Sequence, residues 1–225
     1  MSEWWTYRPD DFLLFSARVY WRMFELQNEA LWPLHLVTVA VGLAIFMFLL
    51  RQPNRDGGWI GLLLAALWIF VGWTFLWDRY AAINWTIFYV APLFAFQAVG
   101  LLIAAIMPGG LAFDRRDIAG WTGLLFAAAG FVLYPLFPPL VGRPWTNAEV
   151  LGIAPDPTVI VTLGLLLAAR GKLLPLLLPI PSLWCLLSGV TLWTMDDRQA
   201  WLPLVMVAIV LAALGLRSLI RRPAS

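Results

Sequence analysis

The sequence predicts an all-α protein, a polytopic bundle of about seven transmembrane helices preceded by an amphipathic helix at the membrane surface. Three observations support this fold class. Hydrophobic residues make up 62% of the 225 residues and charged residues only 12%, whereas soluble domains are about one quarter charged. The apolar residues fall into seven separable runs, and the balance of charge between the runs alternates along the chain.

The lengths of the runs match a lipid bilayer, whose apolar core of ~30 Å is crossed by ~20 helical residues. The expected spans are residues 30–50, 59–77, 84–107, 118–137, 157–169, 173–194 and 200–220. The chain therefore divides into an N-terminal interfacial segment (1–29), a helical bundle (30–220) and a short basic tail (221–225).

The charges of the loops predict the orientation of the bundle. One alternate set of loops, with the C-terminal tail, holds nine cations and three acids, and the other set holds six cations and ten acids. Because positively charged loops stay in the cytoplasm, we expect the N-terminus outside and the C-terminus inside.

The segment before the first span has the periodicity of an amphipathic helix. Apolar residues recur at helical spacing while charged residues occupy other faces: Phe12, Phe15, Val19, Met23 and Leu26 against Arg18, Arg22, Glu25 and Glu29. Two readings remain open: a surface anchor at the outer interface, or a lid over an outward-facing cavity.

Polar and aromatic residues gather toward the outer side of the predicted bundle. Ten of the 14 tryptophans belong to that side, and Gln97 lies near the middle of the third span. This bias favours an aromatic vestibule that opens outward, although a tryptophan belt at the interface produces a similar pattern.

The fifth run is too short to cross alone, because 13 residues reach only ~20 Å. It follows a Pro-Asp-Pro sequence, Pro155 to Pro157, and the stretch before that is apolar. One interpretation is a broken segment, a half-helix or re-entrant stretch followed by a helix, as in the substrate sites of transporters. The other makes Asp156 an N-cap with Pro157 at the first helical position. We expect Asp156 to pair with Arg79, Arg143 or Arg22.

A second polar cluster lies in the predicted outer turn between the second and third spans. Its members carry charge, hydrogen-bonding groups and aromatic walls: Asp78, Arg79 and Asn84 with Trp77, Tyr80 and Trp85. Together they would hold a cation by carboxylate and aromatic-face attraction. Alternatively, Asp78 and Arg79 neutralise each other at the interface.

His35 is the only histidine, and it lies about one turn into the first span. It is either a packing group or a ligand contact, and alone it makes no histidine-based metal site. The sequence also lacks a Walker loop, a dinucleotide fingerprint, a G-x-S-x-G elbow and an HExxH motif. We therefore expect no metal, no cofactor, no nucleic-acid partner and no catalytic residues.

Several stretches resemble a family of bacterial integral-membrane proteins of unknown function. They are Met1 to Tyr7, Asp11 to Ser16, Phe24 to Asn28, Trp77 to Trp85 and Gly152 to Thr158. The resemblance implies a multi-pass protein of the bacterial inner (plasma) membrane and brings no activity with it.

The leading hypothesis is an outward-opening cavity that binds or transports a small cationic or zwitterionic ligand. Its predicted site residues are Asp156, Asp78, Arg79, Asn84, His35, Gln97, Trp77, Tyr80 and Trp85. The alternative is a structural or accessory subunit that packs against other copies of the chain or against a partner membrane protein.

Overall fold

The computed structural model describes residues 14–51, 57–113 and 118–220, with backbone alone for residue 118 and residues 214–220. The first 13 residues of the predicted interfacial segment and the predicted basic tail 221–225 lie outside the described part. So do the charged residues at 52–56 and 114–117, which contributed to the predicted orientation.

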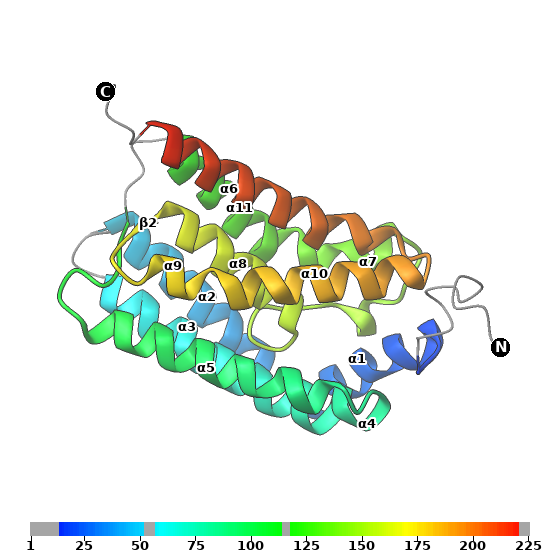
Figure 1. The fold of residues 1–225 in the computed structure, drawn as a ribbon. Helices are drawn as coiled ribbons and strands as arrows, with labels where there is room; N and C mark the ends of the chain where they lie inside the picture. Colours follow the sequence, from blue (N-terminus) through cyan, green and yellow to red (C-terminus); the bar gives the residue numbers. More distant parts are fainter. Residues whose placement is uncertain (1–13, 52–56, 114–117, 221–225) are drawn as a thin grey trace.

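The prediction of an all-α helical fold is confirmed. Long helices run side by side: α2 (Leu34–Arg51), α3 (Gly57–Val71), α5 (Ile87–Ile106), α6 (Ile118–Val132), α8 (Pro155–Ala168), α10 (Pro179–Thr194) and α11 (Trp201–Ile220) (Figure 1). Short helical elements join or extend them: α4 (Ala81–Ile83), η4 (Tyr134–Leu136), α7 (Phe137–Leu140), η5 (Trp145–Asn147), α9 (Leu174–Leu177) and η6 (Arg198–Ala200). Helix α1 (Ala17–Leu31) lies at one end of the bundle, and the antiparallel pair β1 (Ala112–Phe113) and β2 (Ala169–Arg170) lies at the other.

In the described part of the chain, five helical stretches are long and apolar enough to cross a membrane. They are Leu34–Arg51, Gly57–Ile83, Ile87–Ile106, Ala119–Leu140 and Leu174–Thr194. Two further apolar helices, Pro155–Ala168 and Arg198–Ala213, are shorter. The helical composition therefore indicates a membrane protein.

Helix α8 forms the centre of the bundle, and all 14 of its residues are buried. It begins at Pro155 rather than at the predicted Pro157, and the N-cap position belongs to Ala154. The interpretation of Asp156 as an N-cap is therefore wrong, because Asp156 lies inside the first turn. Residues 151–154 are non-helical and equally buried, so the break lies before Pro155 and the Pro-Asp-Pro sequence forms the first turn of α8.

The backbone of this buried stretch is satisfied locally, which explains how it survives among apolar helices. The Gly152 amide donates to Thr158 Oγ1 at 2.8 Å, and the Ala154 amide donates to the Val150 carbonyl at 2.9 Å. Gly152 has a φ of +76°, a conformation that side chains rarely adopt.

The predicted outer turn at residues 77–85 is wrong. The second span continues through a π-helix, η3 (Gly72–Tyr80), and then through α4, so the chain turns only at residues 84–86. Asp78 and Arg79 lower the hydropathy, but at the end of a membrane helix they reach polar surroundings without breaking it. π-Helical segments are rare and occur frequently at functional sites.

Helix α1 begins after Ser16, whose side chain accepts from the Val19 amide at 3.4 Å. Its buried residues are Tyr20, Met23, Phe24 and Gln27, whereas Val19 and Leu26 of the predicted stripe are exposed. The helix is thus rotated from the expected orientation, because aromatic packing decides which face is buried. Phe24, for example, packs on Phe75 of η3 with ring centroids 4.8 Å apart.

Candidate functional site

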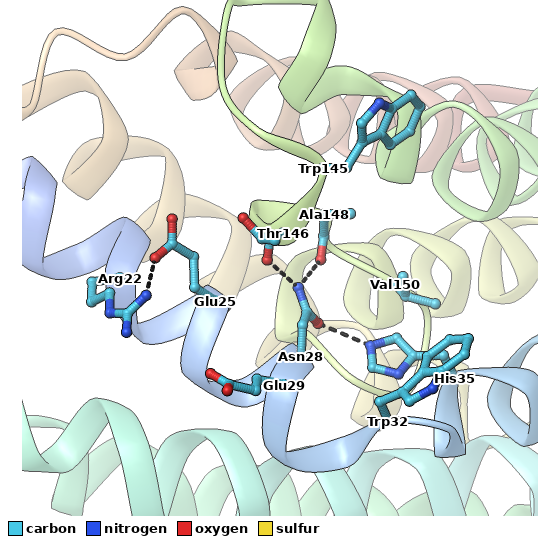
Figure 2. Close-up of a pocket in the computed structure, with 10 residues that line it drawn as sticks. All are labelled: Arg22, Glu25, Asn28, Glu29, Trp32, His35, Trp145, Thr146, Ala148 and Val150. Carbon is cyan, nitrogen blue, oxygen red and sulfur yellow. Dashed lines mark hydrogen bonds and ion pairs between the residues drawn. The ribbon is translucent and has the colours of Figure 1, made fainter.

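Two pockets open along α1. We call the first, of about 600 Å³, the carboxylate pocket; Glu25, Glu29, Asn28, Trp32, His35 and Trp145 are among its walls (Figure 2). We call the second, of about 810 Å³, the arginine pocket; its charged walls are Arg18, Arg22, Glu25, Asp78, Arg79 and Arg143. Arg22 and Glu25 line both pockets. The two pockets therefore adjoin along α1, and they differ in charge.

Asn28 fixes one wall of the carboxylate pocket. Its Nδ2 donates to the carbonyls of Thr146 and Ala148 at 2.7 and 2.9 Å, which ties α1 to the segment before α8. The amide oxygen therefore faces His35 and accepts from its Nε2 at 3.0 Å (Figure 2). In the neutral ring this leaves Nδ1 as an acceptor. Nδ1 is buried and has no hydrogen-bond partner among the described residues.

The acidic groups of this pocket are only partly compensated. Arg22 Nη1 donates to Glu25 Oε2 at 2.5 Å, and this hydrogen bond raises the pKa of Arg22. Glu29 lies one turn further along α1, and its carboxylate makes no hydrogen bond within the described part of the chain. Trp32 and Trp145 are 66% and 61% exposed. The walls of this pocket therefore include a carboxylate and two exposed indole rings, which are groups that attract cations.

Asp156 lies in neither pocket. Its Oδ1 accepts from Trp184 Nε1 at 2.7 Å, and its Oδ2 accepts from Ser188 Oγ at 2.6 Å and from Tyr134 OH at 2.9 Å. The expected pairing with an arginine is therefore wrong, since all three of these partners are neutral. The donors come from α10 and η4, and they hold the start of α8 between these elements.

A second buried acid, Glu149, ends a chain of hydrogen bonds that the sequence did not predict. Gln199 Nε2 donates to Glu149 Oε1 at 2.5 Å, and Arg143 Nη2 donates to Gln199 Oε1. The Arg143 guanidinium also lies over the Trp21 ring, 3.4 Å from its centroid. Burial raises the pKa of the Glu149 carboxyl well above its ordinary value of about 4.5, and nearby Asp156 adds to this shift.

We expect Glu149 to make the protein less stable as pH rises. The folded-state pKa of this carboxyl lies above its unfolded value of about 4.5, so its protonated form stabilises the folded protein. This contribution is complete below pH about 4.5, and it is lost as the pH rises through the folded-state pKa. Glu149→Gln keeps an acceptor for Gln199 and cannot ionise. Thermal unfolding midpoints in detergent from pH 4.5 to 8 should fall more steeply for the wild type than for Glu149→Gln. Parallel curves for the two proteins would contradict the expectation.

The structure divides the nine predicted site residues rather than gathering them into one cavity. Asp78 and Arg79 line the arginine pocket, and His35 lines the carboxylate pocket. Tyr80 is buried against Tyr20, with ring centroids 5.7 Å apart.

The remaining predicted residues stabilise helices or face outward. Gln97 Nε2 donates to the Leu177 carbonyl at 3.0 Å, and Asn84 Oδ1 accepts from the Thr86 amide at 3.1 Å. Trp77 and Trp85 are 43% and 59% exposed and pack against other aromatic rings.

Sequence reasoning did not assign Glu29, Trp32 and Trp145 to a site. Glu25 and Glu29 are four residues apart and share a helix face, which was the available signal. Trp145 lies more than 110 residues further along the chain, so only the fold brings it to α1. Within residues 14–51, 57–113 and 118–220, no three His, Cys, Asp or Glu side chains come together as metal ligands.

Comparisons with known proteins give a family without an assigned activity. No curated protein and no solved structure matches the chain. The model of a family of unknown function (DUF6064) matches residues 17–222, from α1 to beyond the end of α11. Since this match covers nearly the whole sequence, the protein belongs to that family.

Proposed function

We propose that the protein is a bacterial inner-membrane protein that binds, on its outer side, a small ligand carrying a positively charged amine. The observation that supports this most directly is the carboxylate pocket, where the Glu29 carboxylate lies in one pocket with the exposed rings of Trp32 and Trp145. The ligand can be cationic or zwitterionic, since Arg22 borders the same pocket.

The orientation of the bundle supports an outward-facing site. We propose seven crossings, with α8 and α11 added to the five long apolar stretches. Helix α1, with Glu25 and Glu29, lies at one end of the bundle, whereas β2, with Arg170, lies at the other (Figure 1). Over the full sequence, the set of loops that includes Arg170 and the C-terminal tail holds nine cations, against six in the set that includes the arginines near α1. The positive-inside rule then gives the β2 end to the cytoplasm and the α1 end to the outside.

The chemistry of the pocket suits an amine better than an anion. An ammonium group in contact with a carboxylate and with the face of an indole gains attraction from both. The acceptor Nδ1 of His35 adds a hydrogen-bonding position near the wall. An anion would meet two carboxylates, of which only Glu25 is held in an ion pair within the described residues.

We expect Glu29→Gln to weaken the binding of an amine ligand by ~10-fold or more, because it removes a charged contact of ~1.5–3 kcal/mol. The test is a thermal-shift screen of the detergent-purified protein with polyamines, quaternary amines and amino acids, which stabilise the folded state by mass action when they bind.

The matched control is Asp196→Asn, which removes a negative charge from the loop before η6. Asp196 borders neither pocket, and asparagine tolerates its φ of +54°. Binding that survives in the control and weakens in Glu29→Gln supports the proposal. If no amine stabilises a well-folded wild type, the proposal is wrong and the accessory-subunit alternative is favoured.

A further inference from the structure

The arginine pocket collects positive charge from three separate elements. Arg18 comes from α1, Arg79 from η3 and Arg143 from the segment after α7, while Arg22 stands at the border with the carboxylate pocket. Four guanidinium groups therefore face two carboxylates, those of Glu25 and Asp78. This excess of positive charge contrasts with the acidic character of the outer loops in the sequence.

Only one of these arginines forms an ion pair within the described residues, and two others donate hydrogen bonds to neutral amides. Glu25 is taken by Arg22. The Nε of Arg79 donates to Gln27 Oε1 at 3.3 Å, and the Arg143 hydrogen bond goes to the amide oxygen of Gln199.

Arg143 is buried in part and, within the described part of the chain, keeps donors without a partner, although it stacks on Trp21 and donates to Gln199. Its Nε and Nη1 are buried and have no hydrogen-bond partner among the described residues. A buried guanidinium without a full set of partners is destabilising, so an anion nearby would offset that penalty. Glu149 interacts electrostatically with Arg143, but burial favours the neutral form of the Glu149 carboxyl.

Most of the remaining walls of the pocket are apolar. Val19, Met23, Leu26, Ala82 and Ile83 lie beside the arginines. Val19 and Leu26 are also 43% and 38% exposed. A free inorganic ion would use only the arginines, whereas an amphiphile with an anionic head and acyl chains would cover both kinds of surface.

We infer that the arginine pocket binds a phosphate group, presented by the headgroup of a membrane phospholipid. Arginine matches phosphate oxygens with its planar fork of donors, and the groups on α1, η3 and the segment after α7 surround one volume of about 810 Å³. This site goes beyond the proposed amine site, because it uses Arg18, Arg79 and Arg143, which do not line the carboxylate pocket. The two share only Arg22 and Glu25 as walls.

The test compares the wild type with Arg18→Gln/Arg79→Gln in detergent. The probes are inorganic phosphate, glycerophosphate and a short-chain phosphatidylglycerol. Short-chain phosphatidylcholine, whose headgroup carries a phosphate but no net charge, shows how far binding depends on the net charge of the lipid. Thermal stabilisation and native mass spectrometry report binding. We expect phosphatidylglycerol to bind the wild type, and the double variant to bind it at least ~10-fold more weakly, because two charged contacts are lost.

Two further variants keep the test decisive. Arg198→Gln removes one positive charge from an exposed residue of η6 outside both pockets, and it should bind phosphatidylglycerol as the wild type does. Arg18→Glu reverses one exposed charge and replaces the double variant if loss of the Arg79 bond to Gln27 prevents folding.

Each outcome decides the inference. Binding of phosphatidylglycerol alone, lost in the variants, supports a lipid headgroup site. Equal binding of inorganic phosphate and glycerophosphate supports the anion site with a free phosphate as its source. Binding that survives in Arg18→Glu, or no binding of any phosphate probe to the wild type, overturns the inference. The amine site is tested separately by Glu29→Gln.

Discussion

Asp156→Ala is expected to lower the unfolding midpoint of the protein by ~6–12 °C. The substitution leaves three buried donors, on Trp184, Ser188 and Tyr134, without their acceptor. Each unsatisfied group costs ~1–3 kcal/mol, so the lower bound for three is ~3 kcal/mol. For a chain of this size 1 kcal/mol corresponds to ~2–4 °C. Thermal unfolding in detergent at constant pH measures the change.

Asp156→Asn should destabilise less than Asp156→Ala. An amide keeps one oxygen that can accept from the Trp184 ring nitrogen, while its NH₂ can donate to the oxygens of Ser188 and Tyr134. The variant therefore distinguishes two roles of Asp156, as a structural acceptor or as a ligand contact. Asp156 lines neither pocket, which favours the structural role. The amine and phosphate probes should bind Asp156→Asn as they bind the wild type.

A double-mutant cycle with Ser188→Ala provides the sharper control. Ser188 is one of the three donors to Asp156. Once its hydroxyl is removed, Asp156→Ala leaves only two donors, on Trp184 and Tyr134, without an acceptor. The two substitutions together should therefore destabilise less than the sum of their separate effects. Strict additivity would show that the two side chains do not interact in the folded protein, against the geometry described above.

The sequence was sufficient for the helical architecture because hydropathy is a local property. Runs of about 20 apolar residues mark spans wherever they occur, and the short run before Arg170 was recognised from its length alone. The end of the second span, Gly57–Ile83, was harder to predict. Asp78 and Arg79 resembled a turn, yet the helix continues to Ile83, since charges at a helix end reach polar surroundings.

The candidate sites depend on contacts between distant segments, which no local pattern reveals. Asp156 was correctly picked out as a buried carboxylate, but its partners Tyr134, Trp184 and Ser188 lie 22 to 32 residues away. No local pattern around Asp156 favours neutral donors over an arginine as its partner. Similarly, the acidic outer loops suggested a cation site near Asp78, whereas folding places Arg18 and Arg143 around that residue.

The crossing of α6 and α8 leads to a second large effect: Gly164→Leu should prevent the protein from folding. A Cβ at Gly164 would lie 2.5 Å from the Gly123 carbonyl oxygen, and a Cβ at Gly123 would lie 2.3 Å from the Gly164 oxygen. These contacts are with backbone, which cannot rotate away. Small residues at such crossings let membrane helices approach closely. Yield of monodisperse protein after detergent extraction is the measurement.

Gly164→Ala and Gly100→Ala form a matched pair that separates packing from helix propensity. Alanine favours a helix over glycine by ~1 kcal/mol, so Gly100→Ala in α5 should be neutral or stabilising. There the new Cβ would meet only the Cδ2 of Leu177, the far end of a flexible side chain. Gly164→Ala gains the same propensity but forces α6 away from a helix that is buried all round, and overpacking of this kind costs ~1–3 kcal/mol. Opposite signs for the two substitutions would therefore establish close backbone contact as the reason for glycine at 164. Equal stabilisation by both would show that α6 and α8 are further apart than described.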